Sequence, residues 1–161
     1  MSTSTLTVPQ FRLASRTRKA ILVAHVISSV AILGQVWANA VLAMIAIRTP
    51  DMARAAYSFM QHLVFASAAP LSVLALVSGV VLGLGTKWGV LRFRWVAAKL
   101  MLLVVTVLSG ITIQGPLLAQ LLAAPSSTAQ LANLAATAVQ FVLLAVATWL
   151  SVFKPGGRIR R

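Results

Sequence analysis

The chain of 161 residues contains no cysteine and a single acidic residue, Asp51. Without cysteine there can be no disulfide, no thiolate metal ligand and no cysteine nucleophile. With one acid there can be no carboxylate pair for general acid and base catalysis. A catalytic triad is also disfavoured, because an Asp51 in an exposed loop cannot orient a buried histidine. We therefore expect no enzyme activity, no metal site and no cofactor.

Apolar residues make up 60% of the chain and charged residues only 9%, which is far from the composition of a soluble domain. A membrane-spanning helix needs about 20 mostly apolar residues, and lipid-exposed backbone must satisfy its own hydrogen bonds. The sequence therefore predicts an all-α membrane protein with four transmembrane helices in an up-down bundle. The predicted spans are residues 20–47, 57–84, 96–122 and 131–153, between a flexible basic tail at 1–19 and a basic tail at 154–161.

The 14 lysines and arginines give the chain a net charge of +13, and they flank the apolar stretches. Positive residues of membrane proteins concentrate on the cytoplasmic side. An even number of spans then places both termini in the cytoplasm, within a cell membrane. The same placement argues against nucleic-acid binding, since no groove-reading module is present. Three clusters carry most of the charge: Arg12, Arg16, Arg18 and Lys19; Lys87, Arg92, Arg94 and Lys99; and Lys154, Arg158, Arg160 and Arg161.

Two other patterns compete with this interpretation. The run Ala38-Asn39-Ala40 resembles the cleavage site of a secretory signal, but the apolar stretch continues to Ile47, which favours an anchor.

His25 and His62 in a helical bundle raise the question of haem. Each lies about 8 Å from the end of its span, at opposite sides of a core about 30 Å thick. They cannot both ligate one haem, and a lone interfacial or hydrogen-bonded histidine is the simpler interpretation.

Neutral polar side chains gather in the outer half of the predicted spans, where every helix contributes an amide or an imidazole. Amides between membrane helices form interhelical hydrogen bonds, so the leading hypothesis is a non-catalytic membrane protein, an accessory or lipid-associated subunit, with this layer as packing. The alternative is a binder or carrier of a small neutral or weakly polar molecule, in a cavity opening outward near Pro70 and Gly115-Pro116. The residues of this candidate site are Gln35, Asn39, His62, Gln114 and Gln140.

The segment between the second and third spans predicts a basic, aromatic surface at the inner headgroup level. Each basic residue near such a surface attracts anionic lipid by about 1 kcal/mol. Ordinary topological anchoring is the leading interpretation of these charges, and a docking surface for a cytoplasmic partner is the alternative. For the chain as a whole, a membrane-protein partner and a homo-oligomer stay open. The residues assigned to this surface are Lys87, Trp88, Arg92, Arg94, Trp95 and Lys99.

Two sequence runs resemble a known family. One is the loop run Gly83-Leu-Gly-Thr-Lys-Trp-Gly-Val-Leu-Arg92 followed by Trp95-Val-Ala-Ala-Lys99, and the other is Ala24-His25-Val26 with Ser28-Ser29-Val30. Together they look like small bacterial four-helix integral membrane proteins catalogued as a domain of unknown function. The resemblance covers about the first three spans. It implies a bacterial inner-membrane protein and no particular activity.

Overall fold

The computed structural model describes residues 14–85 and 93–155, and within those ranges it contains helices and no strand. Two of the helices are uninterrupted, and the other two each pass through a short π-helical turn. All four are long and apolar enough to cross a membrane. The elements are α1 (Ser15–Arg48), α2 (Pro50–Leu63), η1 (Val64–Ala68), α3 (Ala69–Leu84), α4 (Arg94–Ser109), η2 (Gly110–Gln114), α5 (Gly115–Ala123) and α6 (Ser127–Phe153).

The helices extend beyond the predicted spans at both ends of the bundle. At the first connection, only Thr49 separates α1 from α2, so the predicted loop over residues 48–54 is mostly helical. Pro50 suits the first helical position, since its missing N–H would be unpaired there anyway, and Asp51 complements the positive end of the helix dipole. The predicted flexible tail is likewise helical from Ser15, and its residues before Ala14 lie outside the described ranges.

The ends of α6 are set by ordinary capping. The hydroxyl of Ser126 accepts a hydrogen bond from the backbone N–H of Ala129 at 3.3 Å, so the helix begins at Ser127 rather than at 131. At the other end Lys154 adopts a left-handed conformation with φ of 47°, followed by Pro155, which cannot continue a helix.

Prolines explain the two π-helical turns. Pro70 and Pro116 stand inside long helices, where a proline removes one backbone donor and its ring clashes with the carbonyl four residues earlier. Each lies just after a π-helical turn, η1 or η2. The N–H of Ala69 then bonds the carbonyl of Val64, and that of Gly115 bonds the carbonyl of Gly110. The wider turn absorbs the proline, and the helix continues without a break.

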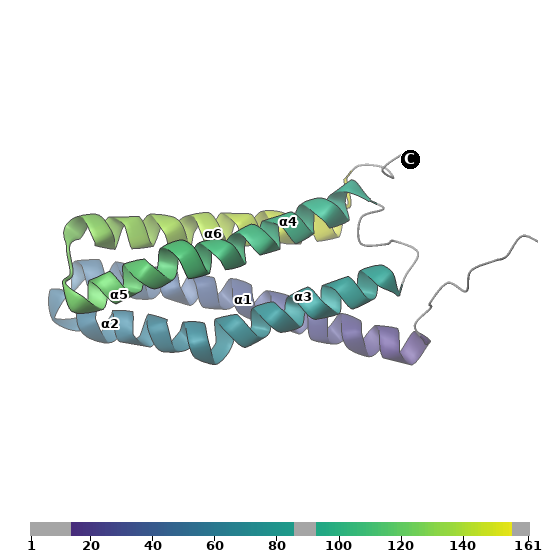
Figure 1. Ribbon diagram of the computed structural model, residues 1–161, viewed down its shortest axis with the longest axis horizontal. Helices are drawn as coiled ribbons and strands as arrows, with labels where there is room; N and C mark the ends of the chain where they lie inside the picture. The colour runs from purple at the N-terminus through teal and green to yellow at the C-terminus, as the bar shows by residue number, and fades with distance from the viewer. Residues whose placement is uncertain (1–13, 86–92, 156–161) are drawn as a thin grey trace, which may run out of the picture.

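Figure 1 shows an elongated bundle with two distinct ends. The α1–α2 and α5–α6 connections lie at one end, here called the far end. The first turns of α1 and α4 and the last turns of α3 and α6 lie at the other, here called the basic end. α1 packs closely against α2 and α3 on one side and against α6 on the other, and α6 also packs against α4. The seam between α3 and α4 is the loosest, and no Cα of α1 lies within 8 Å of one of α4.

Two apolar clusters fill the interior. The far-end cluster draws on α1, α2, α5 and α6, and the middle cluster draws on α1, α3 and α6. Other large apolar side chains point outward, such as Phe65, Met101 and Val152 at 73%, 69% and 68% exposure. The far-end cluster contains Ala43, Ala46, Ala53, Ala56, Tyr57, Met60, Leu118, Leu121 and Ala129, and the middle cluster contains Ile32, Val36, Ala75 and Leu144.

Candidate functional site

A layer of buried polar side chains lies next to the far-end cluster. Residues four apart share a helix face, and three polar residues each stand four positions from a member of that cluster. Asn39 precedes Ala43, Gln114 precedes Leu118, and Asn133 follows Ala129. They therefore face the interior one turn closer to the basic end. The members of this central polar layer are Gln35, Asn39, Gln114, Asn133, Thr137 and Gln140, all of them buried.

Gln35 ties α1 to the first π-helical turn. Its Nε2 donates to the carbonyl of Leu63 at 3.0 Å, and its Oε1 accepts from the hydroxyl of Ser67 at 2.6 Å. The same hydroxyl lies 3.0 Å from the carbonyl of Leu63. Membrane helices interrupted by proline use such side chains to satisfy backbone groups near the break. Gln35 is therefore a structural link between α1 and the α2–η1–α3 segment.

Gln114 makes the matching link on the other side of the bundle. Its Nε2 donates to Asn133 Oδ1 at 3.0 Å and to Thr137 Oγ1 at 2.7 Å. The hydroxyl of Thr137 in turn donates to the carbonyl of Asn133 at 2.8 Å. Two turns of α6 beyond Asn133, Gln140 Nε2 donates to the hydroxyl of Ser109 at 3.2 Å. The α4–η2 segment is thus joined to α6 by the amides of Gln114 and Gln140.

Three atoms of this layer have no hydrogen-bond partner among residues 14–85 and 93–155. They are Asn39 Oδ1, Gln114 Oε1 and Asn133 Nδ2. Asn133 is 0% exposed and Gln114 is 3% exposed, so water outside the bundle does not reach them. A buried polar atom left unpaired costs about 1–3 kcal/mol. Two acceptors and one donor in one layer therefore mark a place where a further polar group would be bound favourably.

The layer is closed toward the far end. Tyr57 and Met60, at 1% and 0% exposure, pack with Leu118 and Leu121 between the layer and the connections at that end. Apolar side chains therefore occupy the side of the layer on which the predicted cavity would open. The α1–α2 and α5–α6 connections are short, and the helix segments between the layer and the far end carry alanines, which permit close packing.

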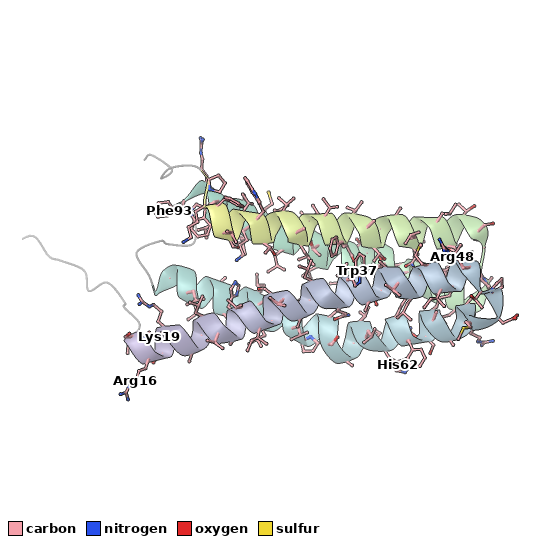
Figure 2. All side chains as sticks on the ribbon, turned by 180° about the vertical axis from the view of Figure 1, so that it is seen from behind. Arg16, Lys19, Trp37, Arg48, His62 and Phe93 are labelled. Atoms are coloured by element: carbon pink, nitrogen blue, oxygen red, sulfur yellow. The ribbon has the colours of Figure 1, made fainter. Side chains whose placement is uncertain are left out.

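The structure brings four of the five residues predicted for this site into one layer and leaves His62 outside it. His62 is exposed, its Nδ1 lies 2.7 Å from the carbonyl of Ser58 in its own helix, and it points away from the bundle (Figure 2). The two histidines have separate surroundings, as the depth argument predicts, since His25 contacts α3 and α4. Within the described ranges no cluster of three metal-ligating side chains occurs.

Sequence reasoning missed several members of the layer. Asn133 and Thr137 stand four apart, and Thr137 and Gln140 three apart, so all lie on one face of α6. That spacing is visible in the sequence and is the signal that could have identified them. Ser67 carries no such signal, because its role follows from its position within the π-helical turn.

A second polar cluster, absent from the sequence prediction, occupies the basic end. His25 Nδ1 lies 2.9 Å from the carbonyl of Ala75 and 3.0 Å from the hydroxyl of Ser78, both on α3. His25 Nε2 lies 3.3 Å from Lys99 Nζ on α4. The ring fits against Gly79, where an added Cβ would stand 3.0 Å from His25 Cε1.

We expect Gly79→Ala to lower stability by about 1–2 kcal/mol, because the new methyl group overpacks the α1–α3 contact and pushes the His25 ring by a few tenths of an ångström against the hydrogen bonds that hold both of its nitrogens. Gly34→Ala is the matched control, since nothing lies within 4 Å of a Cβ added there. That control should be neutral or gain up to about 1 kcal/mol from helix propensity. Equilibrium unfolding of both variants in mixed micelles measures the difference, and equal stabilities would contradict this account of Gly79.

The predicted basic surface is described only in part. Lys87, Trp88 and Arg92 lie outside the described residues. Arg94 is exposed at the start of α4, and Trp95 beside it is half-buried. Lys99 differs from the prediction, because its side chain turns inward to His25 instead of joining the surface.

A comparison of the chain with models of protein families, with curated proteins and with solved structures finds no match. The fold alone defines the class of the protein: an all-helical bundle with four helices long and apolar enough to span a membrane. The resemblance to small bacterial membrane proteins stays a prediction.

Proposed function

We propose that the chain is a non-catalytic integral membrane protein of the bacterial inner membrane, with four transmembrane helices in an up-down bundle and both termini in the cytoplasm. Its support is the outward-facing apolar surface and the length of all four helices. The basic residues at the ends of these helices give the orientation: Arg16, Arg18, Lys19, Arg94 and Lys154 lie at the basic end, and the positive side faces the cytoplasm.

Within that bundle, the central polar layer binds a small neutral molecule that presents a hydrogen-bond donor beside an acceptor. The observation that carries this proposal is the pair Gln114 Oε1 and Asn133 Nδ2, an acceptor and a donor without partners in the described part of the chain, on two side chains already bonded to each other. A primary or secondary cis-amide carries the donor that Gln114 Oε1 lacks and the acceptor that Asn133 Nδ2 lacks. A charged ligand is disfavoured, because no described residue of the layer carries a charge to offset the desolvation of an ion.

Interhelical packing is the competing role, and a specific observation favours it for part of the layer. Both polar atoms of the Gln35 amide are paired, and Gln140 links α6 to Ser109. Packing does not account for Asn39, Gln114 and Asn133, because a layer that served adhesion alone would pair its buried atoms. We therefore assign packing to the paired amides of Gln35 and Gln140, and ligand binding to the residues with unpaired atoms.

Thermal unfolding in lipid nanodiscs with small amides tests the proposal. 2-Pyrrolidone presents a cis N–H and C=O, and N,N-dimethylacetamide is the control of similar size without a donor. We expect 2-pyrrolidone to raise the melting temperature in proportion to the logarithm of its concentration, as a ligand of the folded state does. Asn133→Leu should abolish this rise and Gln140→Leu should keep it. Equal effects of both amides, or an unchanged rise in Asn133→Leu, would contradict the proposal.

A further inference from the structure

Lys99 extends across the interior of the bundle at the basic end. It belongs to α4, yet its Nζ lies 3.3 Å from His25 Nε2 on α1, although no Cα of these two helices lies within 8 Å. The side chain therefore bridges the space between diagonally opposed helices. A lysine that served only to anchor the helix end would instead direct its ammonium outward into the headgroup region.

The hydrogen bonds around His25 fix what this histidine offers to Lys99. Nδ1 lies 2.9 Å from the carbonyl of Ala75, which can only accept, so Nδ1 carries the proton. In the neutral ring Nε2 is then an acceptor, and it takes one N–H of the Lys99 ammonium. His25 thus orients the ammonium and supplies no negative charge.

The charge of Lys99 is left without a counter-charge, and two of its three N–H groups are left without a partner among the described residues. Asp51, the single acid of the chain, lies in the first turn of α2 at the far end. The hydroxyls on the neighbouring turns of α1 and α3 donate to main-chain carbonyls, those of Ser28 and Ser29 to His25 and that of Ser78 to Leu74, and none of the three accepts a hydrogen bond from Lys99. A half-buried ammonium with free donors calls for an anion.

The position of Lys99 indicates where that anion comes from. It stands five residues into α4, roughly 8 Å along the helix from Arg94. Among the contacting pairs of α-helices, α3 and α4 pack least closely. The same helices expose large apolar side chains, including Leu84 at 64% and Met101 at 69%. An amphiphile with an anionic head and apolar tails fits both features.

We propose that the α3–α4 seam at the basic end binds one acidic phospholipid, with its phosphate held by Lys99, which His25 orients from α1. The headgroup enters between α3 and α4, and the acyl chains remain on the apolar outer faces of these helices. Specificity for an acidic lipid follows because Lys99 contributes an unneutralised positive charge. The proposal rests on the membrane placement proposed above, which resistance of the chain to alkaline carbonate extraction tests separately.

High salt separates this interior site from ordinary attraction to the basic surface. Exposed charges are screened within about 3 Å at roughly 1 M salt, and buried pairs are screened much less. The experiment therefore uses the full chain in neutral phosphatidylcholine nanodiscs at about 1 M NaCl, with phosphatidylglycerol as the probe, and counts retained lipid by native mass spectrometry. We expect one phosphatidylglycerol per chain to persist.

Three variants carry the test. Lys99→Gln should lower the affinity for phosphatidylglycerol at least about tenfold, since a hydrogen bond to a charged group is worth roughly 1.5–3 kcal/mol. Lys19→Gln removes the same charge from an exposed position of α1 at the same end and should leave the affinity within about twofold at this salt concentration. His25→Phe keeps the positive charge of Lys99 but removes the hydrogen bond that orients the Lys99 ammonium. The loss of affinity for phosphatidylglycerol should be intermediate. Melting temperatures identify any variant that fails to fold, and Lys99→Met then replaces Lys99→Gln, since an apolar chain removes the unpaired charge without a folding cost.

Two results would overturn the proposal. Equal losses in Lys99→Gln and Lys19→Gln would mean that the lipid binds the basic surface without a site at Lys99. Stabilisation by inorganic phosphate that depends on Lys99, together with no retained phosphatidylglycerol, would mean an anion site that is not a lipid site.

Discussion

Replacing Gln114 by leucine lowers the free energy of unfolding by about 2–3 kcal/mol, and replacing both Gln114 and Asn133 by leucine lowers it by less than either single change. The reason is the asymmetry of buried hydrogen bonds. The single variant Gln114→Leu leaves Asn133 Oδ1 and Thr137 Oγ1 without the amide donor that now serves both. The double variant removes both amides together. It therefore also removes the unpaired acceptor of Gln114 and the unpaired donor of Asn133, so the loss in stability is smaller.

The measurement is a double-mutant cycle, with each unfolding free energy taken from steric trapping or denaturant titration in mixed micelles. Thr137 keeps its own bond to the carbonyl of Asn133 in every variant, because that bond uses its hydroxyl and the main chain. Thr112→Val is the control, since the Thr112 hydroxyl is exposed and bonds only the carbonyl of Leu108 in the same helix. Additive losses in the cycle would refute the asymmetry and would mean that the two side chains act independently.

The sequence predicts the number, order and type of the long elements because composition and length decide them. An apolar run of about 20 or more residues flanked by basic residues leaves few alternatives to a spanning helix. The described part of the chain accordingly has four long apolar helices and no strand. The helix ends are harder to predict, because apolar content says nothing about capping: Pro50 and Ser126 start helices earlier than hydropathy indicates.

The partners of the polar residues lie out of reach of the sequence for a different reason. The hydrogen bond of Gln114 to Asn133 joins residues 19 apart, and that of Gln35 to the Leu63 carbonyl joins residues 28 apart. Such pairs depend on how each helix is rotated about its axis relative to its neighbours, and apolar content does not specify that rotation. Lys99 illustrates the same limit, because its place near a span end predicts a surface residue, whereas the loose α3–α4 seam lets it turn inward.

Asn133→Asp is an isosteric change that should lower stability by about 3 kcal/mol at neutral pH, because it buries a charge. The carboxylate keeps the shape of Asn133 and keeps an acceptor for Gln114 Nε2, but it places a charge at a position of 0% exposure. Asn133 stands only six residues into α6, so the cost comes from burial within the bundle, where a charge left without a partner costs roughly 3–5 kcal/mol. No described cation lies in the layer to offset that cost, since Lys99 binds His25 toward the basic end.

The pH dependence of this variant separates a charge effect from a shape effect. Once protonated, the carboxyl group that Asn133→Asp introduces is neutral and nearly isosteric with the native amide. The deficit of Asn133→Asp should therefore shrink as the pH is lowered, whereas that of Asn133→Leu should stay constant. Unfolding titrations of both variants between about pH 4 and pH 8 measure the contrast, against the pKa of about 3.9 for a fully hydrated aspartate.

A small, pH-independent loss in Asn133→Asp would show that the layer holds enough water to solvate a carboxylate. Ordered water would then satisfy the unpaired atoms of Gln114 and Asn133, because a buried water bonds to otherwise unpaired polar groups. A neutral amide would have to displace that water for no gain in hydrogen bonding, so the layer would offer it no advantage. A large loss that fades in acid means instead that the layer is dry, which is the condition under which its unpaired acceptor and donor favour a ligand.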